Sequence, residues 1–322
     1  MKLIDSDTKC RELQKQVHVL YYNGKPINSF DAAKHCEKTV LEGGQIYIND
    51  VLYGTEYPNS YLDIWYPDED FSKKRPTIVY FHGGGFIFGD KLTGDPLAIG
   101  KSDSMGKLRE IVSRGYNLVN ANYALAPEYR YPVQVIQVNQ VMEFLQKHAK
   151  EYGLDMERVV LTGGSAGADL TEIYGLVVSE PSYASKLGIV PAITSTQLKA
   201  LAIDEAALDS KTFDEGIHTM LGTWLGEDTE EDCKIVQEIN VTEHIKGNYI
   251  PSFINSSNEG IYFIKEAQAL DRVLTEYGIE HELYYRDETY DKLPHGYMDL
   301  LDKNQYAREA FEQMMLFIEK HV

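Results

Sequence analysis

Cysteine is scarce in this chain: Cys10, Cys36 and Cys233 are the three that occur among 322 residues. They are far apart and odd in number, so they provide neither a disulfide framework nor the Cys-x-x-Cys pairs of a zinc site. Long apolar runs are missing too. No stretch reaches the length of a membrane-spanning helix, and the first residues lack the apolar core of a secretion signal. We therefore expect a cytoplasmic protein that binds no metal and enters no membrane.

Basic residues are outnumbered, with 31 Lys and Arg against 50 Asp and Glu and a net charge of −19. A surface of this charge repels the phosphates of nucleic acids and anionic lipid headgroups. The expected partner is a neutral or cationic small molecule, although acidity alone also serves solubility. With 43% hydrophobic residues, the chain has enough apolar side chains for a sizeable core.

Apolar runs alternate with segments of helical spacing along most of the chain. Helices are predicted over residues 133–150, 170–179, 263–277 and 305–320. Apolar strands separated by such helices indicate a parallel sheet covered on both faces, so the predicted fold class is α/β, with a doubly wound, mostly parallel eight-stranded sheet. The eight predicted strands are Gln45–Asn49, Ser60–Tyr66, Thr77–Phe81, Asn117–Ala121, Arg158–Leu161, Leu198–Ile203, Ser252–Asn255 and His281–Tyr285.

Two parts of the chain lack this alternation. Residues 1–44 are polar and predict an N-terminal helical cap segment, which leaves residues 45–322 as the catalytic domain. Residues 205–248 have no strand pattern and carry Met220, Trp224 and Leu225. This stretch is either a lid insertion that roofs a pocket or a plain extra pair of helices.

Two glycine-rich motifs each follow a predicted strand. His82-Gly83-Gly84-Gly85-Phe86 follows the third strand, and Gly163-Gly164-Ser165-Ala166-Gly167 lies between the fifth strand and a helix. Small neighbours let the chain turn sharply and expose the serine hydroxyl, while successive glycines let backbone N–H groups face a substrate oxygen. Together the motifs indicate a serine nucleophile beside an oxyanion-binding loop. The plainer alternative is a glycine-rich turn whose serine caps a helix.

These motifs, with Asn122–Glu128 and His295-Gly296-Tyr297, resemble the hormone-sensitive-lipase-like carboxylesterases of the α/β-hydrolase fold (α/β-hydrolase fold-3). The resemblance runs from about Ile64 to the C-terminus. It implies an α/β-hydrolase fold, no cofactor, Ser165 as nucleophile, a structural role for His82, and an oxyanion hole made by the backbone N–H groups of Gly84, Gly85 and Ala166. The chain departs from the family in having Gly164 where Asp is usual and Ala124 where Arg is usual.

The remaining groups of such a site are a base and an acid, in the chain order serine, acid, histidine. His295 follows the last predicted strand and precedes Gly296, so it is the predicted base. The acid slot after Ser252–Asn255 falls on Glu259 or Gly260. Glu259 is the predicted acid, since a carboxylate there needs only to orient the imidazole and stabilise its cation. The alternatives are Asn258, Asp209, Asp287, Glu288 and Asp291.

The predicted function is a serine carboxylesterase that hydrolyses short-chain acyl or acetyl esters through an acyl-enzyme. Its expected partner is a small-molecule ester, and a homodimer is left open. The uncertain acid motivates one alternative, a ligand-binding protein on a hydrolase fold with a weak or inactive site. A second alternative is an amide hydrolase such as a formamidase, which needs the same groups.

Overall fold

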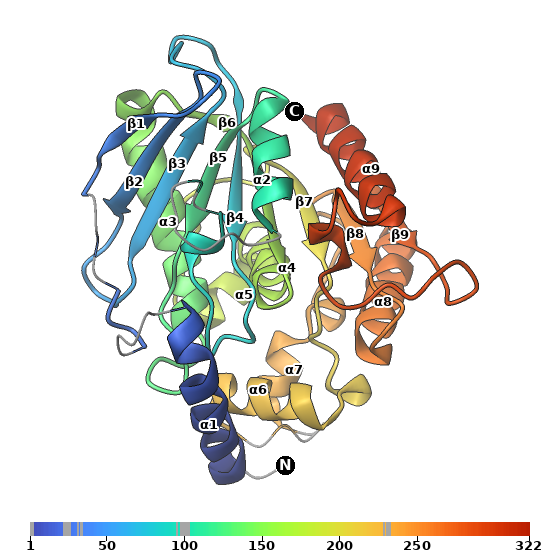
Figure 1. Ribbon diagram of the computed structural model, residues 1–322. Coiled ribbons are helices and arrows are strands. Elements are labelled where there is room, and N and C mark those ends of the chain that lie inside the picture. Colours follow the sequence, from blue (N-terminus) through green and yellow to red (C-terminus); the bar gives the residue numbers. More distant parts are fainter. Residues whose placement is uncertain are drawn as a thin grey trace.

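The computed structural model describes residues 3–21, 27–30, 32, 35–94, 96, 104–227, 229 and 233–322. In this part of the chain, nine strands form one sheet in the order β1-β2-β3-β5-β4-β6-β7-β8-β9 (Figure 1). The pairs from β1 to β3, and the pair of β3 with β5, are antiparallel, and all later pairs are parallel. The strands are β1 (Lys38–Val40), β2 (Ile46–Leu52), β3 (Tyr61–Tyr66), β4 (Pro76–Phe81), β5 (Asn117–Ala121), β6 (Asp155–Gly164), β7 (Leu198–Asp204), β8 (Ser252–Ser256) and β9 (His281–Tyr285).

The mostly parallel α/β sheet confirms the predicted fold class, but the predicted number of eight strands is wrong. The additional strand is β1, which has three residues, none of them buried. So short and exposed a strand has no alternating apolar pattern by which to recognise it. β1 pairs with β2, so the sheet begins at Lys38, before the boundary predicted at residue 45.

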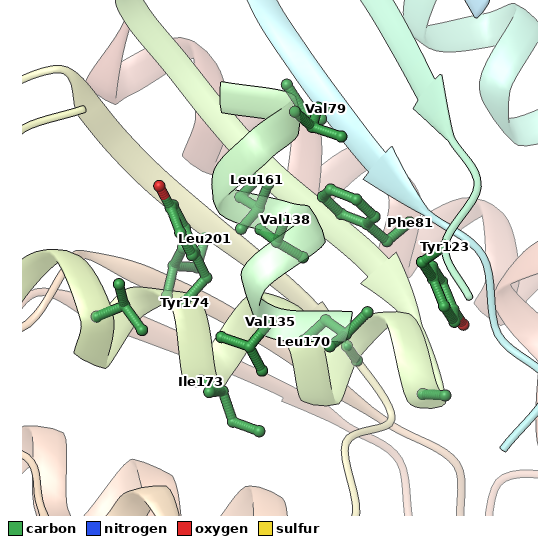
Figure 2. Close-up of a cluster of buried hydrophobic side chains, with 14 of the residues drawn as sticks. Val79, Phe81, Tyr123, Val135, Val138, Leu161, Leu170, Ile173, Tyr174 and Leu201 are labelled. Carbon is green, nitrogen blue, oxygen red and sulfur yellow. The ribbon is translucent and has the colours of Figure 1, made fainter. Parts of the chain in front are cut away.

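Helices cover both faces of the sheet because consecutive residues of the central strands point to opposite sides. Val79, Phe81 and Leu161 pack on one face, against α3 and α4, as Figure 2 shows. Their neighbours Ile78 and Tyr80 pack on the other face, against α2 and α9. The helices are α1 (Leu3–Tyr21), α2 (Ser104–Ser113), α3 (Val133–Tyr152), α4 (Ala166–Ser179), α5 (Pro181–Lys186), α6 (Glu215–Leu225), α7 (Lys234–Ile239), α8 (Ile261–Tyr277) and α9 (Gln305–His321).

Helices α1 and α6 lie side by side at one end of the molecule (Figure 1). Cys10 Sγ contacts the carbonyl oxygen of Thr219 at 3.6 Å, and Lys9 forms an ion pair with Glu215. Helices α6 and α7 lie within the stretch 205–248, together with short 3-10 helices at Ser210–Thr212 and Val241–Glu243. Residues 228 and 230–232 of this stretch lie outside the described residues. Residues 1–2, 22–26, 31 and 33–34 of the predicted cap segment also lie outside them.

None of the described helices is both long and apolar enough to cross a lipid bilayer.

Candidate active site

Ser165 sits at the sharp turn between β6 and α4. Its backbone has φ 56° and ψ −123°, a conformation that costs a non-glycine residue about 1–3 kcal/mol and is concentrated at functional sites. The Ser165 N–H donates to the carbonyl oxygen of Asp204 at 2.9 Å. A Cβ atom on Gly167 would lie 2.0 Å from the carbonyl oxygen of Phe81. The turn therefore requires glycine at this position and presents the serine at the carboxyl end of the sheet.

The loop after β4 packs directly against this turn. A Cβ atom on Gly83 would lie 2.8 Å from the Gly164 carbonyl oxygen and 3.3 Å from Ser165 Cβ. Gly84 and Gly85 have φ values of 112° and 57°, in the region that favours glycine. Within the described part of the chain, the backbone N–H groups of Gly84, Gly85 and Ala166 donate no hydrogen bond. They are therefore available to an oxyanion beside Ser165.

A buried histidine holds this loop in place. The His82 Nδ1–H donates to the Gly83 carbonyl oxygen at 2.7 Å, and the ring stacks on Tyr123 at a centroid distance of 4.2 Å. Burial lowers the pKa of His82 to about 4, so its ring is neutral at pH 7. This environment agrees with a structural role for His82.

A buried lysine anchors the far end of the same loop. Lys91 Nζ lies 2.7 Å from Asp50 Oδ1 and 2.8 Å from Asp63 Oδ1, with its side chain fully buried. The attraction of the two carboxylates outweighs burial and raises the pKa of Lys91, so the charge is retained. The loop that carries the glycines is thus tied at its end to β2 and β3.

The carboxylate beside His295 is Glu205, the residue immediately after β7. His295 Nδ1–H donates to Glu205 Oε2 at 2.8 Å. The same oxygen accepts from Gly296 N–H at 2.6 Å, and Oε1 accepts from Ser257 N–H at 3.0 Å. Glu205 is 2% exposed and has φ 67°. A carboxylate that accepts from Nδ1–H holds the ring in a single tautomer.

The structure thus places Glu205 at His295 Nδ1. The sequence predicted Glu259 at this position, and the structure corrects that prediction. The Glu259 side chain is 46% exposed, with Oε1 3.8 Å from Lys292 Nζ. Its position after β8 lies one strand away from the strand that supplies the carboxylate.

The other proposed acids have local structural contacts. Asn258 donates to the carbonyl oxygens of Arg286 and Asp291 and accepts from Leu293 N–H, so it holds the loop that carries His295. Three other carboxylates each accept a hydrogen bond from a nearby backbone N–H group. The N–H of Lys211 donates to Asp209, that of Thr289 to Asp287, and that of Lys292 to Asp291. The remaining alternative, Glu288, lies in the exposed part of this loop.

Glu205 is not among the predicted acids, because the apolar pattern ends the predicted strand at Ile203 and Glu205 begins the stretch that has no strand pattern. A usable signal was present: an acidic residue directly after the parallel strand next to the one that carries the nucleophile. Ligands and reacting groups gather at the carboxyl ends of such strands.

The His295 ring is partly open to solvent, with 45% of its side chain exposed. Partial burial lowers its pKa, but the hydrogen bond and the charge of Glu205 outweigh that effect and raise the pKa above 6.5. Phe263 stacks on the ring at a centroid distance of 4.3 Å and an interplanar angle of 12°. The ring is therefore held on one face by Phe263 and at Nδ1 by Glu205.

A small pocket joins Ser165 and Glu205. Its volume of about 20 Å³ accommodates roughly one water-sized group. Helix α6 forms its roof: a Cβ atom on Gly85 would lie 2.3 Å from Met220 Sδ. The lining residues are Gly85, Ser165, Ala166, Asp169, Glu205, Ala207, Ile217, Met220, Leu221 and Phe263.

Among the described residues, no group of three or more His, Cys, Asp or Glu side chains is arranged to hold a metal ion.

The chain is similar in sequence to known esterases over part of its length. The chain is 27% identical over 135 residues to a probable carboxylic ester hydrolase, LipM, of Mycobacterium tuberculosis, a match that covers 42% of this chain and 29% of that protein. It is 33% identical over 98 residues to an acetyl esterase of Salmonella paratyphi B, covering 30% of this chain and 27% of that protein. The chain therefore spans less than a third of the length of these curated relatives.

Solved structures share the whole fold. An inhibited esterase B from Lactobacillus rhamnosis superimposes with a TM-score of 0.76 at 17% identity, over 98% of this chain and 96% of that chain. Another structure of that esterase is described as inhibited with a tributyrin phosphonate. These likenesses confirm the α/β-hydrolase fold.

The family model named BD-FAE matches residues 62–271, well over half of the chain and including both glycine-rich motifs. Together with the relatives, this match confirms the resemblance to the hormone-sensitive-lipase-like carboxylesterases. The chain belongs to the BD-FAE family.

Proposed function

We propose that this protein is a serine carboxylesterase that hydrolyses short-chain acyl esters, acetyl esters included. The observation that carries the proposal is the hydrogen bond from His295 Nδ1–H to the buried carboxylate of Glu205, in a pocket shared with the strained Ser165. A histidine held in this way has Nε2 available to accept a proton. The names of the relatives, esterase and acetyl esterase, support the same reaction.

In this mechanism His295 Nε2 takes the proton of Ser165 Oγ as the oxygen attacks the ester carbonyl carbon. The carbonyl oxygen becomes negative and is bound by the N–H groups of Gly84, Gly85 and Ala166, each worth about 3–4 kcal/mol in the transition state. The imidazolium then donates its proton to the departing alcohol oxygen. Water attacks the acyl-enzyme by the same route and releases the carboxylic acid and free Ser165.

Glu205 has the role of the acid in this proposal. Its carboxylate orients the imidazole and stabilises the imidazolium that forms during each proton transfer, without accepting the proton itself. The hydrogen bonds from Ser257 and Gly296 hold it in place beside His295.

The size of the pocket supports short acyl chains. A volume of about 20 Å³ beside the nucleophile takes a methyl-sized group, and Met220 packs over Gly85 in its wall. Helices α1 and α6 are proposed to form the cap over this pocket, consistent with their packing on each other.

The net charge of −19 supports a small-molecule partner over a nucleic acid. The cytoplasmic location and the homodimer stay predictions.

The test compares the protein with Ser165→Ala on p-nitrophenyl acetate and p-nitrophenyl butyrate. We expect the substitution to lower kcat by roughly five to six orders of magnitude, because no nucleophile remains. A matched control, Ser72→Ala, changes an exposed serine and should keep full activity. A fluorophosphonate should phosphonylate Ser165 Oγ in the folded protein with displacement of fluoride, so the protein should gain the mass of the reagent less that of HF.

Two outcomes would contradict the proposal. Equal slow hydrolysis by the protein and by Ser165→Ala would indicate a ligand-binding protein on a hydrolase fold. Faster Ser165-dependent cleavage of p-nitroacetanilide than of p-nitrophenyl acetate would instead indicate an amide hydrolase.

A further inference from the structure

The pocket beside the nucleophile has a carboxyl group in its wall. Asp169 lies four residues after Ser165 in the first turn of α4, and its backbone N–H donates to the Ser165 carbonyl oxygen at 3.0 Å. Residues i and i+4 share a helix face, and helical side chains lean toward the N-terminus. The Asp169 side chain is therefore directed toward the serine, and it lines the pocket.

The carboxyl group of Asp169 has one hydrogen bond within the described part of the chain. Its Oδ1 accepts from Ala207 N–H at 2.7 Å, and its Oδ2 has no hydrogen-bond partner there. The residue is 4% exposed, and the rest of the wall near it is apolar, made by Ile217, Leu221 and Phe263. Besides Ser165 and Glu205, the pocket wall thus contains a carboxyl group with unused hydrogen-bonding capacity.

Two further carboxyl groups lie behind Asp169. Glu172 is on the same helix face, and Glu266 comes from α8; they are 0% and 1% exposed. Glu266 Oε2 accepts from Asp209 N–H at 2.6 Å. Among the described residues, both carboxyl oxygens of Glu172 lack a hydrogen-bond partner, and so does Oε1 of Glu266.

A group of buried carboxyls is costly to ionise in an apolar environment. Burial raises the pKa of Asp169 to about 8 and that of Glu266 to about 7. The pocket wall is thus able to donate as well as accept a hydrogen bond at neutral pH. The same carboxyl groups can also lose a proton and become negatively charged when a cationic group binds beside them.

We propose that Asp169 makes this esterase selective for small acyl groups that carry a hydroxyl or an ammonium group near the carbonyl carbon. This inference rests on the proposed esterase function and names its substrate class. A pocket for one water-sized group, with a carboxyl in its wall, fits –OH or –NH₃⁺ and leaves Asp169 Oδ2 without a hydrogen bond when a methyl group takes that place. Sites built to bond a polar group discriminate strongly against the analogue that lacks it.

The experiment measures kcat/KM at pH 7 for methyl esters that differ in one terminal group of equal size. The first series is methyl 3-hydroxypropanoate, methyl 3-aminopropanoate and methyl butanoate. The second, one carbon shorter, is methyl glycolate, glycine methyl ester and methyl propanoate. Each value is divided by the rate of alkaline hydrolysis of the same ester, which removes differences in intrinsic reactivity.

We expect at least one polar ester to exceed its methyl analogue by tenfold or more in the unmodified protein, and Asp169→Leu to abolish or reverse that preference. Asp169→Asn should keep a preference for hydroxyl and lose one for ammonium, because the amide has no negative charge. The surface variant Asp302→Leu, whose original side chain is 87% exposed, should leave the ratios unchanged. Ratios within one variant are insensitive to the amount of folded protein, and Asp169→Asn supplies them if Asp169→Leu does not fold.

The inference is overturned if the methyl-terminated esters are preferred, or if Asp169→Leu and Asp169→Asn keep the ratios of the unmodified protein. These results would leave the esterase function in place, since Ser165-dependent hydrolysis would still be observed. Hydrolysis that is unaffected by Ser165→Ala would instead remove both proposals.

Discussion

At the scale of single residues, Ser165 and Glu205 share an uncommon backbone conformation. Both are non-glycine residues with positive φ, at 56° and 67°, and each directly follows a strand. Gly164 of β6 is in register with Asp204 of β7, so the two residues leave the sheet side by side. Strain of about 1–3 kcal/mol at each position is held by the surrounding sheet and directs both side chains into one pocket.

The first prediction concerns Glu205. Glu205→Gln should lower kcat for p-nitrophenyl acetate by about three to four orders of magnitude, because the imidazolium loses its counter-charge. It should also shift the pH profile. The base acts as neutral imidazole, so kcat/KM falls as the pH drops through the pKa of His295, which Glu205 raises above 6.5. Without that charge, the acid limb should move to lower pH.

The control for this prediction is Glu259→Gln, which removes an exposed carboxylate and should change neither kcat nor the acid limb. A large loss in Glu259→Gln with normal activity in Glu205→Gln would return the acid to the position favoured by the sequence.

At the scale of elements, α6 controls the space above the nucleophile. Met220 Sδ lies over Gly85 of the glycine-rich loop, and Ile217 and Leu221 lie beside it in the pocket wall. Contacts with α1 hold the helix in place, including the ion pair of Lys9 with Glu215 and the contact of Cys10 with Thr219. Two of the described α-helices, α6 and α7, lie in the stretch 205–248, and we propose that α6 acts as a lid over the pocket.

Met220→Ala should lengthen the acyl chains that the enzyme accepts. Removal of the thioether opens the pocket where it is narrowest, and one methylene in an apolar pocket changes kcat/KM by about 10- to 200-fold. We expect the ratio of p-nitrophenyl hexanoate to p-nitrophenyl acetate to rise by at least tenfold. Leu316→Ala on α9, where the leucine is 64% exposed, is the matched control. An unchanged ratio in Met220→Ala would mean that α6 does not limit the acyl chain.

At the scale of the whole molecule, several ionisable side chains are buried in the core. Some are paired, as in Lys107, which contacts Asp204 at 2.9 Å and Asp299 at 2.6 Å. Glu172 is different, because it is fully buried and its pKa is raised well above 4.5 by burial and by the nearby Glu266 and Asp169. Such a group makes stability depend on pH.

The direction in which the free energy of unfolding changes with pH follows from proton binding. Between the ordinary carboxyl pKa of the unfolded chain and the raised pKa of the folded state, the folded protein binds more protons. Its free energy of unfolding therefore falls as the pH rises, by up to about 1.4 kcal/mol per pH unit for each such group. We expect Glu172→Gln to flatten this fall between pH 5 and pH 7, measured by urea unfolding at each pH. The control, Glu151→Gln, makes the same charge change at a side chain that is 63% exposed and should leave the slope as it was. A slope in Glu172→Gln equal to that of the unmodified protein would contradict the prediction.

The sequence by itself determined the features that depend on residues adjacent in the chain. Apolar alternation predicted eight of the nine strands in the described part of the chain. The glycines around Ser165 and after His82 predicted a sharp turn and a bare loop, because backbone crowding is a local effect. The short strand β1 was not predicted, since it has no clear apolar period. Helices α2 and α5 were not predicted either, although α2 buries Met105, Leu108, Ile111 and Val112 at helical spacing.

Only the tertiary structure decided which carboxylate meets His295. Glu205, Ser257 and Gly296 come from three separate loops, and their hydrogen bonds exist only when β7, β8 and β9 lie side by side. The same holds for the carboxyl group in the pocket wall, whose neighbours come from α4, α6 and α8. Local sequence determines backbone conformation through short-range sterics, whereas the partner of a buried charge is set by which distant segments the fold brings into contact.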